Sequence, residues 1–545
     1  MLHQFFEYGF RVGKFRCFQK GGRLAGARRW WVGGLLASGL LLGPARSRAA
    51  EGARPNILVI LADDMGVGDV STLNPRSAWQ TPHLDRLARE GMTFTDAHSS
   101  SAVCTPTRYT LLTGRYSWRS RMKRGVLQGY SSSLIEPGRL TLPGFLRAQG
   151  YATAMFGKWH LGLDFAKSGS RAEDVDYLKP FGGGPTAHGF DRFFGISASL
   201  DMPPYVWLRG DRVTSPPAGE VLDSPAPKLW RAGPIGGDFK MEEVQPRLIE
   251  ETVAYLGERA AARDGRPFFV YLALAAPHTP TLPTKAFAGK TPTLYGDFVL
   301  QIDADVGKLL ATLEKTGLAK NTLVIFTSDN GFAPAADIPP HRDFGHDPSA
   351  GMRGVKSDAF EGGHHVPFIA RWPGVTPVGG RCPDVIGQLD LFATFAELLG
   401  APVPGNMAED SSSMLALLRG QPLPATRRPA LVHHSAEGEF AIREGSWKLI
   451  LCPGSGGWSS PTAAPSQWLK TEATDLSTLP PFQLYNLSAD PGEKNNLAAQ
   501  HPEVLQRLGQ RMRGYIERGR SMPGPAAVNA PGPWPQTAWM NQFSP

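Results

Sequence analysis

The chain has little cysteine and, outside its first 50 residues, no excess of charge of either sign. Its 545 residues include four cysteines, of which Cys17 lies near the N-terminus. Cys382 and Cys452 could pair in an oxidising compartment or remain two free thiols, and the sequence leaves both open. Nine of the 57 basic and one of the 49 acidic residues fall in residues 1–50, so the remainder carries 48 of each. This balance gives no indication of nucleic-acid binding.

The chain also lacks an apolar run long enough to span a bilayer comfortably. The run from Trp30 to Leu42 follows Arg28-Arg29 and precedes small residues that end at Ala49-Ala50. Spanning takes about 20 residues. Residues 1–50 therefore indicate a signal peptide cleaved near Ala49 or Ala50, export through the cell's export machinery, and no stable membrane span. We expect a periplasmic or extracellular protein; a twin-arginine and a general secretion signal both fit.

Four apolar runs each end in polar residues. The runs are 56–62, 151–156, 267–274 and 322–327, and they lead to Asp63-Asp64, Lys158 with His160, His278, and Asp329-Asn330. Runs this apolar predict strands buried on both faces. Helical patterns lie between them, from Thr81-Pro82 to Gly91 and over 297–316. The alternation predicts an α/β fold with a mostly parallel sheet, and ligands gather at the carboxyl ends of such strands.

That edge of the sheet collects oxygen ligands. Asp63, Asp64, Asp329 and the amide of Asn330 form a hard, all-oxygen set. Such a set favours Ca²⁺, or Mg²⁺, over zinc, which prefers nitrogen and sulfur. Each pair taken alone could be an ordinary turn or helix cap. Their concentration at several strand ends favours a site.

The segment from Cys104 to Arg115 reads as a short helix with a thiol at its start. Pro106 fits the first helical turn, and Gly114 is a helix-stop signal. Cys104 would therefore meet free backbone N–H groups and the positive end of the helix dipole, which suits an anion. A capped helix with a buried cysteine is the plain alternative.

The segment Cys104-Thr105-Pro106-Thr107-Arg108, followed by Leu112-Thr113-Gly114-Arg115, resembles the signature of the formylglycine-dependent (type I) sulfatases. Further motifs of that family appear in order over residues 55–498: Asn56 to Asp64, Gly157 to Gly162, Pro277 to Pro280, Ser328 to Gly331, Lys356 ahead of Glu361-Gly362-Gly363, and Leu484 to Leu497. The resemblance implies an alkaline-phosphatase-like fold: a large mixed, mostly parallel sheet flanked by helices, with a smaller C-terminal α+β domain.

The resemblance also implies the chemistry. Cys104 would be converted to formylglycine (3-oxoalanine) by a maturation enzyme and would bind the metal, usually Ca²⁺, with Asp63, Asp64, Asp329 and Asn330. Arg108 would contact the hydrated aldehyde. Lys158, His278 and Lys356 would clamp the sulfate, with His278 or Lys356 protonating the departing alcohol and His160 taking a proton when the aldehyde returns. The expected substrate is a small-molecule or polysaccharide sulfate ester, with a sulfated sugar favoured.

Further residues are expected either to contact the substrate or to have a structural role. Ser199 and Asp201 lie where relatives carry sulfate- or substrate-contacting groups. His346 and Asp347, and His433-His434 further on, are plausible substrate-side residues. The string Glu361-Gly362-Gly363-His364-His365 departs from the family's frequent arginine at its last position.

We expect four segments along the chain. They are a signal peptide (1–50), the catalytic domain (51–426), an α+β domain (427–520) with a hairpin at 440–450 and a helix at 503–518, and a Pro/Gly-rich tail of loops (521–545). Two rival functions remain: a phosphate or phosphonate ester hydrolase of the same fold, and a catalytically silent binding protein that keeps Cys104 unmodified.

Overall fold

The computed structural model describes residues 54–225, 228–334, 344–424, 427–459 and 475–543. The predicted signal peptide lies outside these ranges. Within them, no helix combines the length and the apolar character that crossing a membrane requires. Cys382 and Cys452 are both buried and are not joined by a disulfide. Of the two possibilities that the sequence left open, the structure therefore contains the two free thiols.

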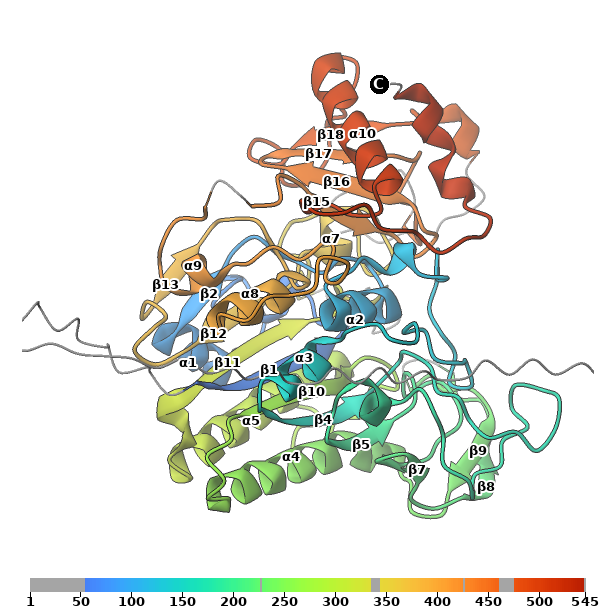
Figure 1. The fold of residues 1–545 in the computed structure, drawn as a ribbon, viewed down its shortest axis with the longest axis vertical. Helices are drawn as coiled ribbons and strands as arrows, with labels where there is room; N and C mark the ends of the chain where they lie inside the picture. Colours follow the sequence, from blue (N-terminus) through green and yellow to red (C-terminus); the bar gives the residue numbers. More distant parts are fainter. Residues whose placement is uncertain (1–53, 226–227, 335–343, 425–426, 460–474, 544–545) are drawn as a thin grey trace, which may run out of the picture. The chain divides into compact units, whose positions relative to one another are not determined.

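A ten-stranded mixed sheet forms the centre of the fold (Figure 1). Its order is β13 (Gly380–Cys382), β2 (Met92–Phe94), β12 (Phe368–Arg371), β11 (Thr322–Ser328), β1 (Asn56–Asp63), β10 (Phe268–Pro277), β4 (Ala152–Lys158), β5 (Arg192–Ile196), β6 (Leu208–Arg209) and β7 (Arg212–Val213). The five adjacent strands from β11 to β5 run parallel. The four predicted apolar strands are therefore confirmed, and they are neighbours.

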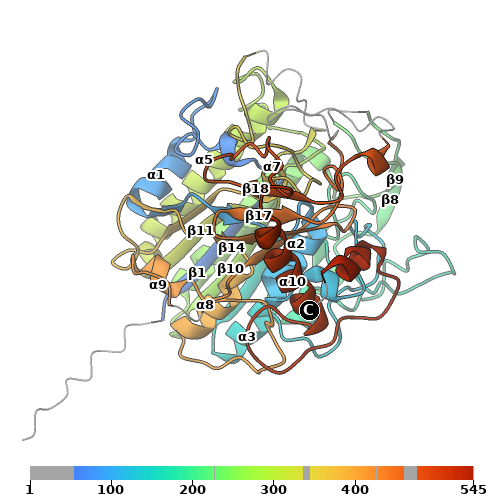
Figure 2. The same ribbon diagram turned by 90° about the horizontal axis from the view of Figure 1, so that it is seen from above.

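Both faces of the sheet are covered by helices, which explains the continuous apolar runs. Ile57, Val59 and Leu61 of β1 belong to the core that includes α2 (Cys104–Thr113), α3 (Leu142–Ala148) and α8 (Asp390–Leu398). Leu58 and Ile60 belong to the opposite core, with α1 (Pro82–Glu90), α4 (Val244–Ala261) and α5 (Leu294–Lys315). Figure 1 shows α4 and α5 side by side beneath the central strands, and Figure 2 shows α5 from above. The predicted helices starting at Thr81-Pro82 and over 297–316 are confirmed as α1 and α5.

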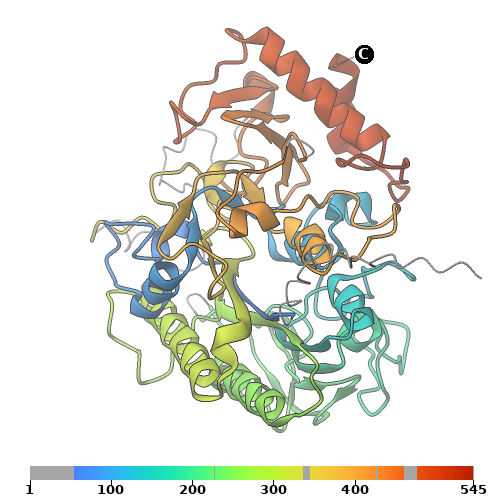
Figure 3. The same cartoon turned by 60° about the vertical axis from the view of Figure 1, so that its left-hand side comes forward.

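A second, antiparallel sheet follows in the chain. It consists of β15 (Leu431–His434), β16 (Phe440–Glu444), β17 (Trp447–Ile450) and β18 (Gln483–Asn486). Helix α10 (Pro502–Glu517) packs against β16 and β17 (Figure 3). The core between them also contains Tyr116 and Trp118 from the segment after α2. The fold is thus the predicted large mixed sheet with a smaller α+β part, and the hairpin and the last helix lie where the sequence places them.

The remaining elements are short. They are β3 (Ala97–His98) paired with β14 (Ile386–Gly387), the hairpin β8 (Pro217–Val221) and β9 (Gly233–Gly236), α7 (Glu361–His364), α9 (Leu415–Leu418), and 3₁₀ turns at 67–69, 117–119, 185–188, 241–243, 318–321 and 476–478.

The Pro/Gly-rich tail differs from the prediction of loops alone. Residues Pro535–Gln542 form a 3₁₀ helix, and Trp539 and Phe543 are buried in the core beneath α10. Trp534 packs on the edge of the same core. Three large aromatic side chains provide enough apolar area to hold this segment on the domain in spite of its composition.

Candidate active site

The carboxyl ends of four parallel strands bring the predicted site residues together. Asp63 is the last residue of β1, and Asp64 follows it with a left-handed backbone (φ 67°). Asp329 and Asn330 follow β11, Lys158 ends β4, and His278 follows β10. Hydrogen bonds between these side chains, given below, show that they form one cluster, as parallel-strand topology predicts.

The oxygen atoms of this cluster suit a divalent cation. Asn330 Nδ2 donates to Asp64 Oδ1 at 2.7 Å, and the backbone N–H of Asp64 donates to Asp329 Oδ1 at 3.2 Å. Asp63 Oδ1 and Asn330 Oδ1 are buried and have no hydrogen-bond partner among the described residues. Buried acceptors without donors are costly unless something else satisfies them. Three carboxylates and one amide oxygen, with two of their oxygen atoms lacking donors, therefore fit Ca²⁺ or Mg²⁺.

Three buried cations face the three carboxylates. Lys158 Nζ lies 2.6 Å from Asp63 Oδ2, and Lys356 Nζ lies 2.8 Å from Asp64 Oδ2. The third cation is Arg108, described below. Three negative and three positive side chains cancel, so a bound divalent cation would leave the site with a net charge of +2. Such a site attracts an anionic group, and its donors would stabilise charge that develops during the reaction.

Arg108 links several parts of the cluster. Its Nε and Nη2 donate to Asp329 Oδ2 at 3.0 and 2.7 Å, and its Nη1 donates to the carbonyl oxygen of Lys158 at 3.0 Å. Nη2 also lies 3.5 Å from Asp63 Oδ1. Although burial disfavours the charged guanidinium, Asp329 and Asp63 outweigh it and raise the pKa of Arg108 above its ordinary value. The guanidinium is therefore fixed in place as a permanent cation.

The carboxylates of the cluster differ in their pKa. Burial acts to raise the pKa of Asp63 and Asp64, but the nearby cations, Lys158 for Asp63 and Lys356 for Asp64, lower both below the usual value. Burial raises the pKa of Asp329, and the charge of Asp63 raises it further. Asp63 and Asp64 are thus held as anions, which is the form that binds a metal cation.

Cys104 is the first residue of α2, and its side chain is buried. Gly114 ends this helix in the left-handed conformation, with its N–H bonded to the Thr110 carbonyl. Burial raises the pKa of the Cys104 thiol, in spite of the nearby Lys158 and Lys356. An unmodified Cys104 would therefore be a protonated thiol, which is a poor nucleophile. The placement of the helix start agrees with the sequence, whereas the environment does not activate a thiolate.

Two histidines of the cluster are held by backbone carbonyls. His278 Nδ1 lies 2.5 Å from the Thr279 carbonyl, so its Nε2 faces Ser199 Oγ at 3.3 Å and Asp64 Oδ2 at 3.5 Å. His160 Nε2 lies 2.8 Å from the Leu127 carbonyl. Its Nδ1 is buried and has no hydrogen-bond partner among the described residues. Burial, Lys158 and Arg108 hold the pKa of His160 well below its ordinary value, so its ring is neutral.

Of the expected substrate contacts, the structure brings Ser199 into the cluster. Its hydroxyl accepts from Lys158 Nζ at 2.7 Å and contacts His278. Asp201, two residues on, pairs with Arg231 Nη1 at 2.7 Å, while its Oδ1 has no hydrogen-bond partner among the described residues.

His346 and His434 lie elsewhere. His346 is buried with Nε2 2.9 Å from Asp69 Oδ1 and Nδ1 accepting from the Ala78 N–H at 3.2 Å, so both ring nitrogens are engaged in structural contacts. Its neighbour Asp347 accepts from backbone N–H groups of its own turn. The His434 side chain is buried against Phe440. No contact joins either ring to the Cys104 cluster in the described part of the chain.

The comparisons with known proteins agree with this geometry. The family model described as Sulfatase matches residues 55–401. The chain belongs to the sulfatase family. It is 34% identical over 500 residues to an N-acetylgalactosamine-6-O-sulfatase from Bacteroides thetaiotaomicron, covering 84% of this chain and 92% of the relative. It is also 34% identical to arylsulfatase A from Homo sapiens, covering 84% and 86%.

A solved structure from work on glycosaminoglycan metabolism by Bacteroides thetaiotaomicron superposes with a TM-score of 0.73 at 34% identity, covering 85% of this chain and 99% of the other. The sulfatase is accordingly a sulfuric ester hydrolase with the alkaline-phosphatase-like fold.

Two supporting residues of the sulfatase were not found from the sequence. Ser328 Oγ accepts from the Met65 N–H at 2.9 Å and donates to the Asn330 carbonyl at 3.0 Å. Gln388 Nε2 donates to the Ser328 carbonyl at 2.6 Å. Together they fix the two loops that carry Asp64 and Asn330. Ser328 lies inside a quoted motif and could have been singled out, but Gln388 is 60 residues away and carries no sequence signal.

Proposed function

We propose that this sulfatase is an exported, formylglycine-dependent enzyme that removes sulfate from a carbohydrate. The observation that supports this most is the neutral cluster of three buried carboxylates and three buried cations at the start of α2, with two oxygens lacking donors. The carbohydrate part of the proposal rests on the relatives, of which one is described as acting on N-acetylgalactosamine 6-sulfate. The export part rests on residues 1–50 of the sequence.

The residues fit two groups that the mature enzyme would contain. Asp63, Asp64, Asp329 and Asn330 would hold a divalent cation, with Ca²⁺ the expected ion, and Cys104 would be present as formylglycine. When bound, these groups supply a polarised hydrated aldehyde oxygen as the nucleophile. The burial of Cys104 supports this, because it raises the pKa of the thiol and leaves the unmodified side chain a weak nucleophile in this environment.

The chain's own side chains bind and orient the sulfate group. Lys158 and Lys356 present ammonium groups on two sides of the cluster, and Ser199 Oγ, which touches both Lys158 and His278, adds a short polar contact. These donors are buried and fixed, so they need little reorganisation as charge develops on the sulfate oxygens. Arg108 holds Asp329 and the end of β4 in register with them.

Proton transfer falls to His278 and His160. As the ester S–O bond breaks, the leaving oxygen takes the bonding electron pair and needs a proton, which His278 Nε2, in the protonated ring, or Lys356 Nζ would give. His160 Nδ1 is buried and without a partner among the described residues, so its lone pair would accept a proton in the second half of the reaction, while burial, Lys158 and Arg108 lower the pKa of the ring and make it a weak base. Water consumed overall converts the ester into an alcohol and inorganic sulfate.

The proposal is tested by the mass of the tryptic peptide 90–108 from protein made in its own host, followed by turnover of a panel of sulfated sugars that includes N-acetylgalactosamine 6-sulfate. Formylglycine at position 104 with release of sulfate supports it. Matched phosphate esters and the Cys104→Ala variant serve as controls. An unmodified cysteine in protein from the native host would overturn the formylglycine assignment, and preferential hydrolysis of the phosphate esters would overturn the sulfate specificity.

A further inference from the structure

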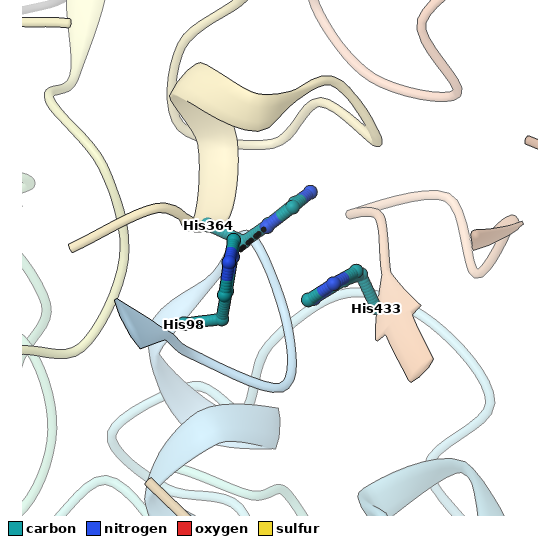
Figure 4. A group of neighbouring side chains, drawn as sticks. All are labelled: His98, His364 and His433. Atoms are coloured by element: carbon teal, nitrogen blue, oxygen red, sulfur yellow. Dashed lines mark hydrogen bonds between the residues drawn. The ribbon is translucent and has the colours of Figure 1, made fainter. Parts of the chain in front are cut away.

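A second group of metal-binding side chains lies apart from the oxygen cluster. His98 ends β3, His364 ends α7 and His433 belongs to β15, so the three rings come from distant parts of the chain (Figure 4). All three are fully buried. One nitrogen of each lies within 4.8 Å of the corresponding nitrogens of the other two. The group therefore joins two segments of the large domain to the first strand of the small sheet.

Each of these rings has one nitrogen facing an oxygen acceptor on its outer side. The pairs are His98 Nε2 with Asp96 Oδ1 at 2.6 Å, His364 Nε2 with the Ala359 carbonyl at 3.2 Å, and His433 Nδ1 with the Ser99 carbonyl at 3.3 Å. Histidines that bind metals usually donate their other N–H to a carboxylate or backbone carbonyl in this way. Two outer nitrogens also lie near cations, since Arg443 Nη1 is 3.1 Å from His98 Nε2 and Lys448 Nζ is 3.0 Å from His364 Nε2. When the outer nitrogens carry the ring protons, the three inner nitrogens carry lone pairs.

The inner nitrogens are close together and poorly satisfied. His98 Nδ1 and His364 Nδ1 are 3.1 Å apart, and His433 Nε2 is buried with no hydrogen-bond partner in the described part of the chain. Two nitrogens bound to one tetrahedral zinc at about 2.0–2.1 Å would be roughly 3.3 Å apart. The separation of His98 and His364 thus matches that of two ligands on one ion.

The ring positions indicate one adjustment on binding. Rings on a tetrahedral ion would have centroids about 5 Å apart. His98 lies 5.3 Å from His364 and 4.9 Å from His433 by this measure. His364 and His433 are stacked at 3.7 Å, which is too close for two ligands of one ion. The His433 ring would therefore slide out of this stack when an ion binds.

The charged side chains around His98, His364 and His433 are compatible with a bound cation. Three carboxylates, those of Asp96, Glu361 and Glu493, surround two cationic side chains, Lys448 and Arg443. Lys448 Nζ lies 3.0 Å from His364 Nε2 but also contacts Glu361 at 3.0 Å and Glu493 at 2.9 Å. If the Nε2–H of His364 donates to the Ala359 carbonyl instead, Lys448 still contacts these two carboxylates. Burial raises the pKa of Glu493 to about 7, so the carboxylates balance or exceed the two cations in charge, and the surroundings do not oppose a divalent ion.

A hydrogen-bonded relay without a metal is the competing arrangement. In it, Lys448 donates to His364 Nε2, His364 Nδ1–H donates to His98 Nδ1, and His98 Nε2–H donates to Asp96. This relay satisfies His98 and His364 but leaves His433 Nε2 buried without a partner among the described residues. A shared ion accounts for all three inner nitrogens, and for that reason we favour it.

We propose that His98, His364 and His433 form a site for a divalent transition-metal ion, with zinc the best match, that fastens the small C-terminal sheet to the catalytic domain. Imidazole nitrogens suit zinc, copper or nickel, whereas the oxygen cluster suits Ca²⁺ or Mg²⁺, so the two sites select different ions. A water molecule would complete a tetrahedral set. The burial of all three ligands indicates a structural ion that is acquired during folding.

The test measures zinc per chain in the full-length protein produced without a histidine tag, in medium containing zinc, and treated with EGTA and gel filtration before elemental analysis. We expect about one zinc per chain in the wild-type protein. The His433→Gln variant should retain less than about a fifth of that amount, because a ligand is lost. His501→Gln, at an exposed histidine, and Asp329→Asn, in the oxygen cluster, should both retain the wild-type amount.

A second measurement does not depend on variants that fold. Wild-type protein produced with cobalt in place of zinc should show the visible absorption bands of Co²⁺ held in a tetrahedral nitrogen site. Well-folded wild-type protein that contains no zinc and gives no cobalt bands would overturn the proposal in favour of the hydrogen-bonded relay. Unchanged zinc content in folded His433→Gln would overturn it as well.

Discussion

Replacing Arg108 with lysine should weaken the whole site, although the charge is kept. The guanidinium makes two hydrogen bonds to Asp329 Oδ2 and one to the Lys158 carbonyl, and the side chains of Arg108 and Asp329 are fully buried. A lysine ammonium can keep one contact with Asp329 but cannot span the rest. Hydrogen bonds to charged groups contribute about 1.5–3 kcal/mol each, so losing two costs ~3–6 kcal/mol. Breaking a buried ion pair, at about 3–5 kcal/mol, gives a similar figure.

The assay is urea unfolding followed by tryptophan fluorescence. With a slope of at least about 3 kcal/mol/M for a chain of this size, the midpoint of the Arg108→Lys variant should fall by up to ~1–2 M. Sulfate release should fall roughly 10²–10³-fold because a fixed cation of the site is displaced. The matched control is Arg124→Lys, whose partner Glu437 is solvent-exposed, and it should change stability by less than about 1 kcal/mol. Equal midpoints for the two variants would refute the role assigned to Arg108.

Three further outcomes are expected. Burial and the charge of Glu437 raise the pKa of Glu439 from 4.5 to about 7, so the folded protein keeps this proton to a higher pH than the unfolded chain does. The free energy of unfolding should therefore fall as the pH rises from about 4.5 to 7. Glu439→Gln should remove up to about 3 kcal/mol of that loss, measured by urea titrations at pH 5 and 8. Asp410→Asn should cost about 3–5 kcal/mol, measured by the same unfolding assay, because it leaves the buried Arg119 guanidinium without its bidentate partner. Treatment with EGTA should lower both the melting temperature and activity, and added Ca²⁺ should restore them; an unchanged melting temperature would contradict the oxygen-ligand site.

The parts of the fold that the sequence predicted are those whose physical cause is local. β1, β4, β10 and β11 are buried on both faces, so each appears in the sequence as an unbroken apolar run. Because parallel strands end at the same edge, the polar residues after them could be grouped before any coordinates were known. The chemistry carried by Cys104 was predicted by a motif that is contiguous in sequence.

The remainder depends on contacts between distant segments, which no local pattern reports. His98 and His364 are 266 residues apart yet share a hydrogen-bond distance. For His346 the sequence left a substrate-side and a structural role open, and in the structure its two ring nitrogens contact Asp69 and Ala78. The composition of the tail predicts loops, whereas Trp539 and Phe543 anchor it in the core. Side-chain identity alone could not distinguish these outcomes.

Backbone hydrogen bonds connect the small C-terminal sheet to two loops that carry predicted site residues. The His434 carbonyl at the end of β15 accepts from the Ala102 N–H at 2.9 Å, and the Ala102 carbonyl accepts from the Ser357 N–H at 2.8 Å. The Ser357 carbonyl then accepts from the Ala436 N–H at 2.9 Å, which closes the connection just after the same strand.

Ala102 lies two residues before Cys104, and Ser357 directly follows Lys356. A displacement of β15 would therefore move the predicted nucleophile and one of the predicted sulfate-binding cations together. Since His433 precedes His434 on that strand, the ion proposed at His98, His364 and His433 would act on the same connection. Loss of that ion should then reduce sulfate release by misplacing both loops, while Asp63, Asp64 and Asp329 stay in place at the ends of β1 and β11.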